Sequence, residues 1–375
     1  MNGLDFRLGC VRDAAKVEGF NRRMSAAGSP HRVSLEKPFT TIAQNEGSPV
    51  VQERVFCFEG DELRGGASAR RMTFLVNGRP EEVAAWMGPV SEGIINPAFA
   101  MVAPRIEREM RRRYPLIFAT GALDSGAGEM MYRAGWYTRP IPFHFAVLRA
   151  HPFLRNIAHL RRRRGLKLLT DLAAASGLGT VGLALLDMVQ RARGRYPRTD
   201  GLIVERVEGW GEWVDDVWER VRGKYALIGD RSSKALVSLY PTENEHFIRL
   251  RFSTADTRRL LGWAVVTASR VKDHKQFGNM VLGAIVDLLA APEDACAVAG
   301  GTVAALRDAN ADLVVVNHSD RRWNEAFERV GMLPARTNHY LFLAPELKKR
   351  FSPIDECSER FFFTRGDGHG PIHLW

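Results

Sequence analysis

Apolar and polar residues alternate along three stretches in the first half of the chain, and this period-two pattern predicts β-strands. The strands are expected at 50–59, 69–76 and 82–90, with Gly60-Asp61 and Asn77-Gly78 as turns. Helical spacing of apolar residues predicts helices over 13–27, 98–113 and 125–134. Two short apolar runs, 116–121 and 143–148, predict buried strands. Together these elements predict a mixed α/β domain.

Two segments about 190 residues apart resemble each other. Residues 116–136 read LIFATGALDSGAGEMMYRAGW, and residues 313–332 read LVVVNHSDRRWNEAFERVGM. Each predicts a buried strand, a polar turn and a helix closed by a glycine, Gly135 or Gly331. Each also follows a helix (98–113 or 295–309) and precedes a strand (143–148 or 339–343). We therefore expect tandem domains at 1–150 and 200–345, a helical connector at 151–199 and a C-terminal extension at 346–375.

Composition narrows the class of protein. The chain has 375 residues, 45% of them hydrophobic and 26% charged, which suits a globular protein with a sizeable core. The net charge of +10 permits an anionic partner such as nucleic acid, a membrane face or a phosphorylated cofactor. Its four cysteines are scattered and show no metal-binding spacing, which indicates reduced thiols and a cytoplasmic protein without a metal.

Neither a signal peptide nor a membrane span is expected. The first ten residues hold no apolar core, and the longest uncharged stretch, 172–186, is shorter than the about 20 residues that a span needs. The connector does contain a basic run, Arg161, Arg162, Arg163 and Arg164, close to that apolar stretch. This run is either a solvated part of the linker or a peripheral contact with the anionic inner face of a membrane.

Several enzyme classes lack their motifs in this sequence. A Ser-His-Asp spacing, H-E-x-x-H, a Walker loop and the Rossmann G-x-G-x-x-G are all missing. Hydrolase, zinc peptidase, NTPase and dehydrogenase functions therefore have no support.

The element order and the helix end MYRAGW, residues 131–136, resemble the GCN5-related N-acetyltransferase superfamily and its LYxxxGF signature. AFERVGM, residues 326–332, is the matching piece of the second copy. The stretches GAIVDLLAAPED (283–294) and FFFTRGDGHG (361–370) are similar to tandem acyltransferases of exopolysaccharide systems and to FemAB-like aminoacyl transferases.

The resemblance implies an acetyl-CoA or other acyl-CoA cofactor, with no metal. In the superfamily the fourth and fifth strands separate and bind the pantetheine, and the next helix start binds the pyrophosphate. The positions implied here are Val90, Ser91, Gly93, Ala100, Val102, Ala103 and Arg105. Tyr132 is implied as the proton donor to the departing sulfur; the alternative is a tyrosine that packs its helix against the sheet.

The chain departs from the superfamily pattern in both copies. In the phosphate loop, Ala100, Met101 and Ala103 replace the expected arginine and glycines, and Met101 is expected to crowd a pyrophosphate. In the second copy we expect Phe327 at the position of Tyr132, and Pro292-Glu293-Asp294 place acidic groups where a phosphate would bind. The second copy is therefore expected to be structural or to bind the acceptor.

Transfer to an amine also needs a proton acceptor. Glu92 and Asp124 are the candidates in the first copy, and His318 and His274 in the second. The alternative for each is a helix-capping or solvated side chain, and His144 is expected in the core.

The favoured function is acyl-CoA-dependent N-acyltransfer (or O-acyltransfer) to a sugar or other amine or hydroxyl acceptor in cell-envelope polysaccharide assembly. One alternative is an inactive binding or scaffold protein. The other is aminoacyl transfer from tRNA, which the positive charge would also fit.

Overall fold

The computed structural model describes residues 3–33, 47–156, 182, 188–189, 200–274 and 277–368. The chain forms two compact units, each built from separate stretches. The first unit comprises Met1–Pro140, Ala226–Asp230 and Asn338–Cys357, and the second comprises Ile141–Tyr225, Arg231–Thr337 and Ser358–Trp375. Arg161–Arg164 and most of the expected connector lie outside the described residues, except for its start, α4 (Ala150–Asn156).

The sheet of the first unit has the strand order β1-β2-β3-β4-β5-β15-β6, with β9 beside β3. Its strands include β1 (Leu4–Leu8), β2 (Val50–Glu59), β3 (Glu62–Val76), β4 (Arg79–Ser91), β5 (Ile117–Gly121), β6 (Tyr137–Pro140), β9 (Leu227–Gly229) and β15 (Tyr340–Leu343). Its helices include α1 (Ala14–Ala26), α2 (Val102–Arg113), α3 (Gly126–Arg133) and α12 (Pro345–Lys348).

The three predicted strands form an antiparallel meander, β2 to β4. The Asn77-Gly78 turn is confirmed, since both residues have positive φ, 49° and 78°. β3 begins seven residues earlier than predicted, because 62–68 is rich in small residues and hides the alternation. Helix α2 is shorter than predicted because a separate 3₁₀ turn, Pro97–Phe99, precedes it.

Apolar side chains cover both faces of the first sheet. Helix α1 packs Val17, Phe20 and Met24 against one side of β2 and β3. Helix α2 packs Val102, Ile106 and Met110 into a second cluster that includes Trp86 of β4. The buried residues of α2 therefore fix the position of its start on the first sheet.

The sheet of the second unit has the order β14-β7-β13-β12-β11-β10-β8. Its strands are β7 (Phe143–Val147), β8 (Leu202–Val207), β10 (Ile248–Thr254), β11 (Leu260–His274), β12 (Gly278–Ala290), β13 (Leu313–Asn317) and β14 (Leu333–Ala335). Its helices include α8 (Trp213–Val221), α9 (Ser233–Leu239), α10 (Ala295–Asp308) and α11 (Arg321–Arg329). Both sheets thus repeat one strand plan, and the predicted tandem α/β fold is confirmed.

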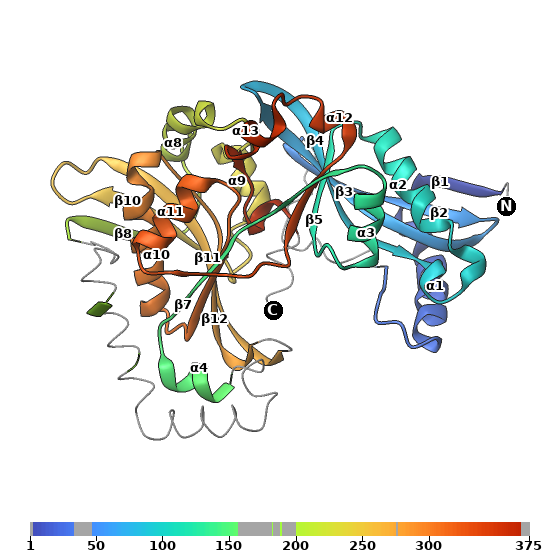
Figure 1. Cartoon of the computed structure of the whole chain (residues 1–375), viewed down its shortest axis with the longest axis horizontal. Coiled ribbons are helices and arrows are strands. Elements are labelled where there is room, and N and C mark those ends of the chain that lie inside the picture. The colour runs from blue at the N-terminus through green and yellow to red at the C-terminus, as the bar shows by residue number, and fades with distance from the viewer. Residues whose placement is uncertain are drawn as a thin grey trace. The chain divides into compact units, whose positions relative to one another are not determined.

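The two sequence repeats exchange one strand each. β15 comes from the second sequence repeat, yet it pairs with β5 and β6 in the first sheet. In return β7, from the first repeat, pairs with β13 and β14 in the second sheet. Figure 1 shows the exchange by colour, with red β15 beside β5 and green β7 among orange strands. The contiguous ranges 1–150 and 200–345 therefore describe the sequence repeats, whereas the compact units have other bounds.

No helix among the described residues is long and apolar enough to cross a membrane.

Candidate functional site

Strands β4 and β5 run side by side and then separate. Their parallel pairing covers Ala84, Ala85 and Trp86, and beyond Trp86 strand β4 continues to Ser91. A β-bulge follows at once: Gly88, with a φ of 55°, and Pro89 together face one residue of β3. Glycine suits this bulge because other residues are strained at positive φ. The bulge bends β4 away at the carboxyl end of β5, as the superfamily resemblance implies.

Helix α2 starts beside this separated strand with its first amides uncapped by a side chain. Its cap residue is Met101, which makes no side-chain capping hydrogen bond. Met101 is 47% exposed, so its side chain extends into solvent. Ala100 is exposed, Ala103 and Arg105 are partly exposed, and Val102 is buried in the core. An uncapped helix start with a nearby arginine suits an anionic group.

The other implied cofactor residues have structural tasks in the described fold. Val90 packs in the core on the α1 side, and the Ser91 hydroxyl accepts a hydrogen bond from the Gly93 amide. A Cβ added to Gly93 would lie 2.6 Å from the carbonyl oxygen of Phe99, so glycine lets the loop fold onto itself. The side chains of Val90 and Ser91 therefore serve the fold itself.

Glu92 is buried and held by two arginines. Its carboxylate accepts hydrogen bonds from Arg23 Nε at 2.8 Å and from Arg64 Nη1 at 3.1 Å. Burial opposes its ionisation, but the two arginines prevail and lower the pKa of Glu92. A proton acceptor needs a pKa nearer neutrality and access to the acceptor. The geometry therefore favours a structural role for Glu92 in joining α1, β3 and the loop before α2.

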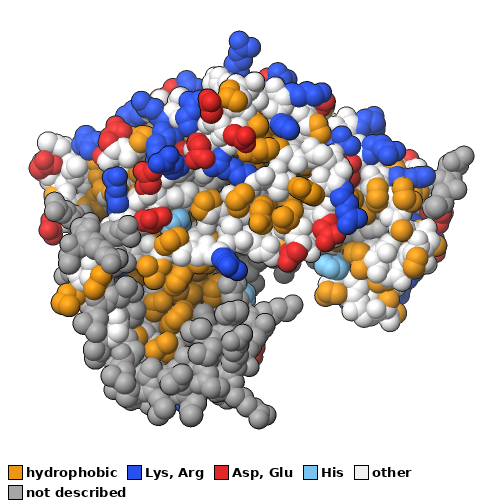
Figure 2. Space-filling model, in the orientation of Figure 1, with side chains coloured by type: hydrophobic (Ala, Val, Ile, Leu, Met, Phe, Trp, Pro, Cys, Tyr) orange, Lys and Arg blue, Asp and Glu red, His pale blue; other side chains and the backbone are white. Residues whose placement is uncertain are grey.

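The arginines at the end of α2 are neutralised within the helix. Arg111 pairs with Glu107, and Arg112 and Arg113 pair with Glu109. They lie roughly 14 Å or more along the helix from its start. On the face shown in Figure 2, Lys and Arg side chains are likewise mixed with Asp and Glu. This run therefore contributes little charge to an anion at the helix start, where Arg105 is the nearer candidate.

The helix ends of the two repeats match in a register other than the expected one. Gly135 and Gly331 close the helices with positive φ, 81° and 89°. Counting back four residues from each glycine pairs Met131 with Phe327, and Tyr132 corresponds to Glu328. Placing Phe327 at the position of Tyr132 is therefore wrong. Met131 and Phe327 are both buried, whereas Tyr132 is 63% exposed.

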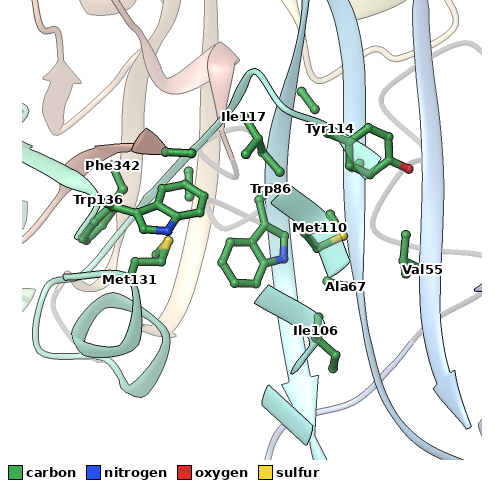
Figure 3. Close-up of a cluster of buried hydrophobic side chains, with 14 of the residues drawn as sticks. Val55, Ala67, Trp86, Ile106, Met110, Tyr114, Ile117, Met131, Trp136 and Phe342 are labelled. Carbon is green, nitrogen blue, oxygen red and sulfur yellow. The ribbon is translucent and has the colours of Figure 1, made fainter. Parts of the chain in front are cut away.

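The buried position is part of the core beneath the separated strands (Figure 3). Met131 packs there with Trp86 and Trp136, whose ring centroids are 5.8 Å apart. The indole nitrogen of Trp136 donates to Glu107 of α2 at 2.8 Å, which ties α2 to the segment that follows α3. Tyr132, one residue further on, is turned away from this cluster. It does not pack its helix against the sheet.

Tyr132 instead lines an open pocket of about 530 Å³ in the first unit. The pocket also contains Asp124, so two of the three expected catalytic residues lie together there. The other lining residues are Leu123, Glu129, Arg133, Asn338 and Tyr340. Because Leu123 and Asp124 follow β5 closely and Tyr340 is the residue of β15 that pairs with Gly121, the pocket lies at the carboxyl end of β5.

Local packing brings α3 close to the end of β5. The Ser125 hydroxyl caps α3 by accepting from the Gly128 amide at 3.0 Å. A Cβ on Gly128 would lie 2.2 Å from the carbonyl oxygen of Ala122, so only glycine permits this close approach. Tyr132 and Asp124 are consequently held on adjoining, well-packed segments.

The first residue of β15, Tyr340, and the nearby Asn338 also line the pocket. Asn338 Nδ2 donates to Asp124 Oδ1 at 2.9 Å, and Tyr340 packs partly against the core. The sequence alone does not point to Asn338 or Tyr340, because both lie at the end of the second repeat, far from residues 116–136 in the chain. Only a sign in the sequence that 339–343 pairs with 116–121 would identify them.

The second unit places its histidines in or beside the core. His318 is fully buried against Trp323, Phe327 and Phe362, and burial holds its pKa well below the usual value. His144 is also buried, as expected, and His274 stacks on Phe277. Asp294 pairs with Arg259 at 2.8 Å. Among the described residues, no group of three or more His, Cys, Asp or Glu side chains could hold a metal ion.

No protein-family model matches the chain, and no curated protein matches it in sequence. Solved structures do match. Saccharomyces cerevisiae N-myristoyltransferase with bound myristoyl-CoA aligns with a TM-score of 0.52 and 11% identity over 92% of this chain and 80% of that one. A GCN5-related N-acetyltransferase from Anabaena variabilis aligns at 0.52 and 10%, over 90% and 72%.

The chain has a tandem GCN5-related N-acetyltransferase fold. A probable N-acyltransferase from Enterococcus faecalis also aligns, at a TM-score of 0.50 and 9% identity over 92% of this chain and 73% of that one. At such low identities the likeness covers the fold. In this fold the separation of β4 from β5 and the start of α2 are the features to which the resemblance assigns the cofactor.

Proposed function

We propose that the chain is an acyl-CoA-dependent N-acyltransferase, an acetyltransferase in the simplest case, whose first unit holds the cofactor. The observation that carries this proposal is the separation of β4 from β5 after Trp86, next to the uncapped start of α2. Backbone groups of 87–91 suit the amides of a pantetheine, and the amides of α2 with Arg105 suit a pyrophosphate. The solvent-directed Met101 leaves that helix start open, so the residues present fit the cofactor.

Bound acyl-CoA would supply an activated thioester carbonyl to the site. Asp124 then serves as proton acceptor for the incoming amine or hydroxyl, while Asn338 holds its Oδ1 in place. The Tyr132 hydroxyl donates a proton to the departing sulfur. Exposure of both groups in one pocket supports these roles, whereas the buried, doubly paired Glu92 is left out of them.

The pocket suggests a polyhydroxylated acceptor. Its carboxylates, its amide and Arg133 can bond to hydroxyl or amino groups, and Tyr132 and Tyr340 supply flat apolar rings. A sugar amine or hydroxyl in cell-envelope polysaccharide assembly combines these features. We place this activity in the cytoplasm; a peripheral contact with the inner membrane face through Arg161–Arg164 concerns residues outside those described.

Calorimetric titration with acetyl-CoA and with CoA tests the proposal. We expect both to bind, and Arg105→Gln to weaken binding about tenfold, the loss of one charge-assisted hydrogen bond. Arg112→Gln is the matched control, because it removes the same charge from the far end of α2 and should leave affinity unchanged.

Absence of heat with both ligands would overturn the proposal in favour of a scaffold protein. Steeply salt-dependent binding of tRNA instead would favour aminoacyl transfer. The neutralised Arg111–Arg113 run makes that alternative less favoured.

A further inference from the structure

The C-terminal segment Phe361–Gly368 lies where β12 and β13 separate in the second unit. The pairing of these strands ends at Ile285, and a β-bulge follows at Val286. This repeats the arrangement of β4 and β5, where pairing ends at Trp86 and the bulge follows at Gly88. The two separations occupy the same place in the two strand plans.

On the β13 side the segment bonds to Ser319, two residues after the strand. The Ser319 amide donates to the carbonyl oxygen of Phe363 at 3.0 Å, and the Phe363 amide donates to the Ser319 hydroxyl at 2.7 Å. That hydroxyl in turn donates to the carbonyl oxygen of Phe361. The segment is therefore bonded to the chain just beyond the end of β13.

On the β12 side the segment bonds to Asp287, just after the bulge. Thr364 Oγ1 donates to Asp287 Oδ1 at 3.2 Å, and Arg231 bridges Asp287 and Asp367 with 2.7 Å to each. Tyr240 donates its hydroxyl to Asp287 at 2.8 Å. All the charged groups in this network are buried, so each depends on the others.

The segment is packed as tightly as a core. Phe361, Phe362 and Phe363 are fully buried. A Cβ on Gly366 would lie 1.9 Å from the Tyr240 hydroxyl oxygen, so the backbone itself fills the space there. An arm resting on the surface would show neither feature.

We propose that residues 361–367 are the permanent occupant of the opening between β12 and β13, so that the chain binds one acyl-CoA, in the first unit alone. The segment bonds to the Asp287 side chain of β12 and to Ser319 just beyond β13, so it lies at the carboxyl ends of both separated strands, where a cofactor would have to enter. This inference rests on the proposed function for its cofactor count, while the occupancy of the opening is a separate statement about the second unit.

Native mass spectrometry with excess CoA, combined with hydrogen–deuterium exchange, tests it. We expect one CoA per chain, slow exchange of peptides covering 361–367 without CoA, and no change there when CoA is added. Peptides covering 87–91 and 102–105 should become more protected. Two CoA molecules per chain, or fast exchange of 361–367 in either state, would overturn the inference.

A chain that binds no CoA but keeps 361–367 protected would contradict the proposed function and leave the occupied opening established. Asp367→Asn should speed exchange of 361–367 at least tenfold by weakening the bond to Arg231. The control Asp273→Asn makes the same change at an exposed position near the end of β11 and should not speed this exchange. Thr364→Ala is the milder replacement if Asp367→Asn does not fold, and unchanged exchange in it would count against the network's role.

Discussion

Tyr132 follows the buried residue Met131 directly in α3, and its side chain is therefore exposed and not packed in the core. Met131 fills the core against Trp86 and Trp136, so the tyrosine hydroxyl is left in the pocket with Asp124. Neither Tyr132 nor Asp124 is needed for packing, since both are exposed. Their removal should therefore affect activity without affecting stability.

Tyr132→Phe should lower kcat about a hundredfold with acetyl-CoA and a competent amine acceptor, because the proton donor is lost. Its melting temperature should match the wild type. Tyr137→Phe removes a hydroxyl from β6 outside the pocket and is the control. Equal activity of Tyr132→Phe and the wild type would mean that the hydroxyl donates no proton.

Asp13 gives the first unit a stability that depends on pH. Its buried carboxylate accepts two hydrogen bonds from Arg7 and one from the Cys10 amide, which lower its pKa to about 2. Because the pKa is depressed on folding, the contribution is complete above about pH 4 and is lost as the pH falls to about 2. It amounts to at most about 2 kcal/mol.

Asp13→Asn should therefore be less stable than the wild type at pH 6, and the difference should vanish near pH 2. Denaturant unfolding at a series of pH values measures it. Asp61→Asn, which removes an exposed carboxylate paired with Lys16, is the control and should change little at any pH. A constant difference between Asp13→Asn and the wild type across this range would contradict the assignment.

At the scale of elements, each exchanged strand stabilises the sheet of the other repeat and not the sheet of the repeat to which its sequence belongs. Phe342 of β15 is fully buried in the cluster of the first unit, although its sequence belongs to the second repeat. Phe145 of β7 packs on the cluster of the second unit, although it belongs to the first repeat. Each strand also supplies hydrogen bonds to the sheet of the other repeat.

Phe342→Ala should destabilise the first unit by about 3–5 kcal/mol, since it leaves a cavity beneath β5. Hydrogen exchange should speed up in β4 and β5 and stay unchanged in β12 and β13. Phe145→Ala is the reciprocal variant, expected to act on β13 and more weakly because Phe145 is partly exposed. Effects confined to β12 and β13 in Phe342→Ala would disprove the exchange.

At the scale of the whole molecule, the exchange makes the two repeats dependent on each other for folding. A fragment 1–199 lacks β15, with the fully buried Leu341, Phe342 and Leu343, and a fragment 200–375 lacks β7. Each fragment would leave two strands of its sheet without the neighbour between them. Such edges are prone to aggregation.

Fragments 1–199 and 200–375 should therefore be insoluble or unfolded when each is produced alone, and should form a folded complex when produced together. Circular dichroism and size-exclusion chromatography distinguish these states. The full-length chain cleaved at a protease site inserted between 199 and 200 is the control, and its two pieces should stay together. A fragment 1–199 that is folded and monomeric on its own would contradict this expectation.

The elements and their order followed from the sequence wherever a local pattern encodes them. Period-two alternation located β2 and β4, the Asn77-Gly78 pair located their neighbouring turn, and the repeated strand–helix pattern located both copies of the fold. Asp124 and Tyr132 could be selected because the end of β5 and the end of α3 are recognisable from nearby residues. Each of these signals lies within a short stretch of neighbouring residues.

Tertiary structure alone decided the partners of each strand, the side of α3 that Tyr132 occupies and the fate of the C-terminal segment. A run such as 339–343 is equally suited to either sheet. Its apolar pattern indicates that the strand is buried but does not indicate which strand lies beside it. The pairing of Glu92 with Arg23 and Arg64 likewise depends on elements that are distant in the sequence. The physical reason is that pairing and burial depend on contacts between residues far apart in the chain, which local periodicity does not record.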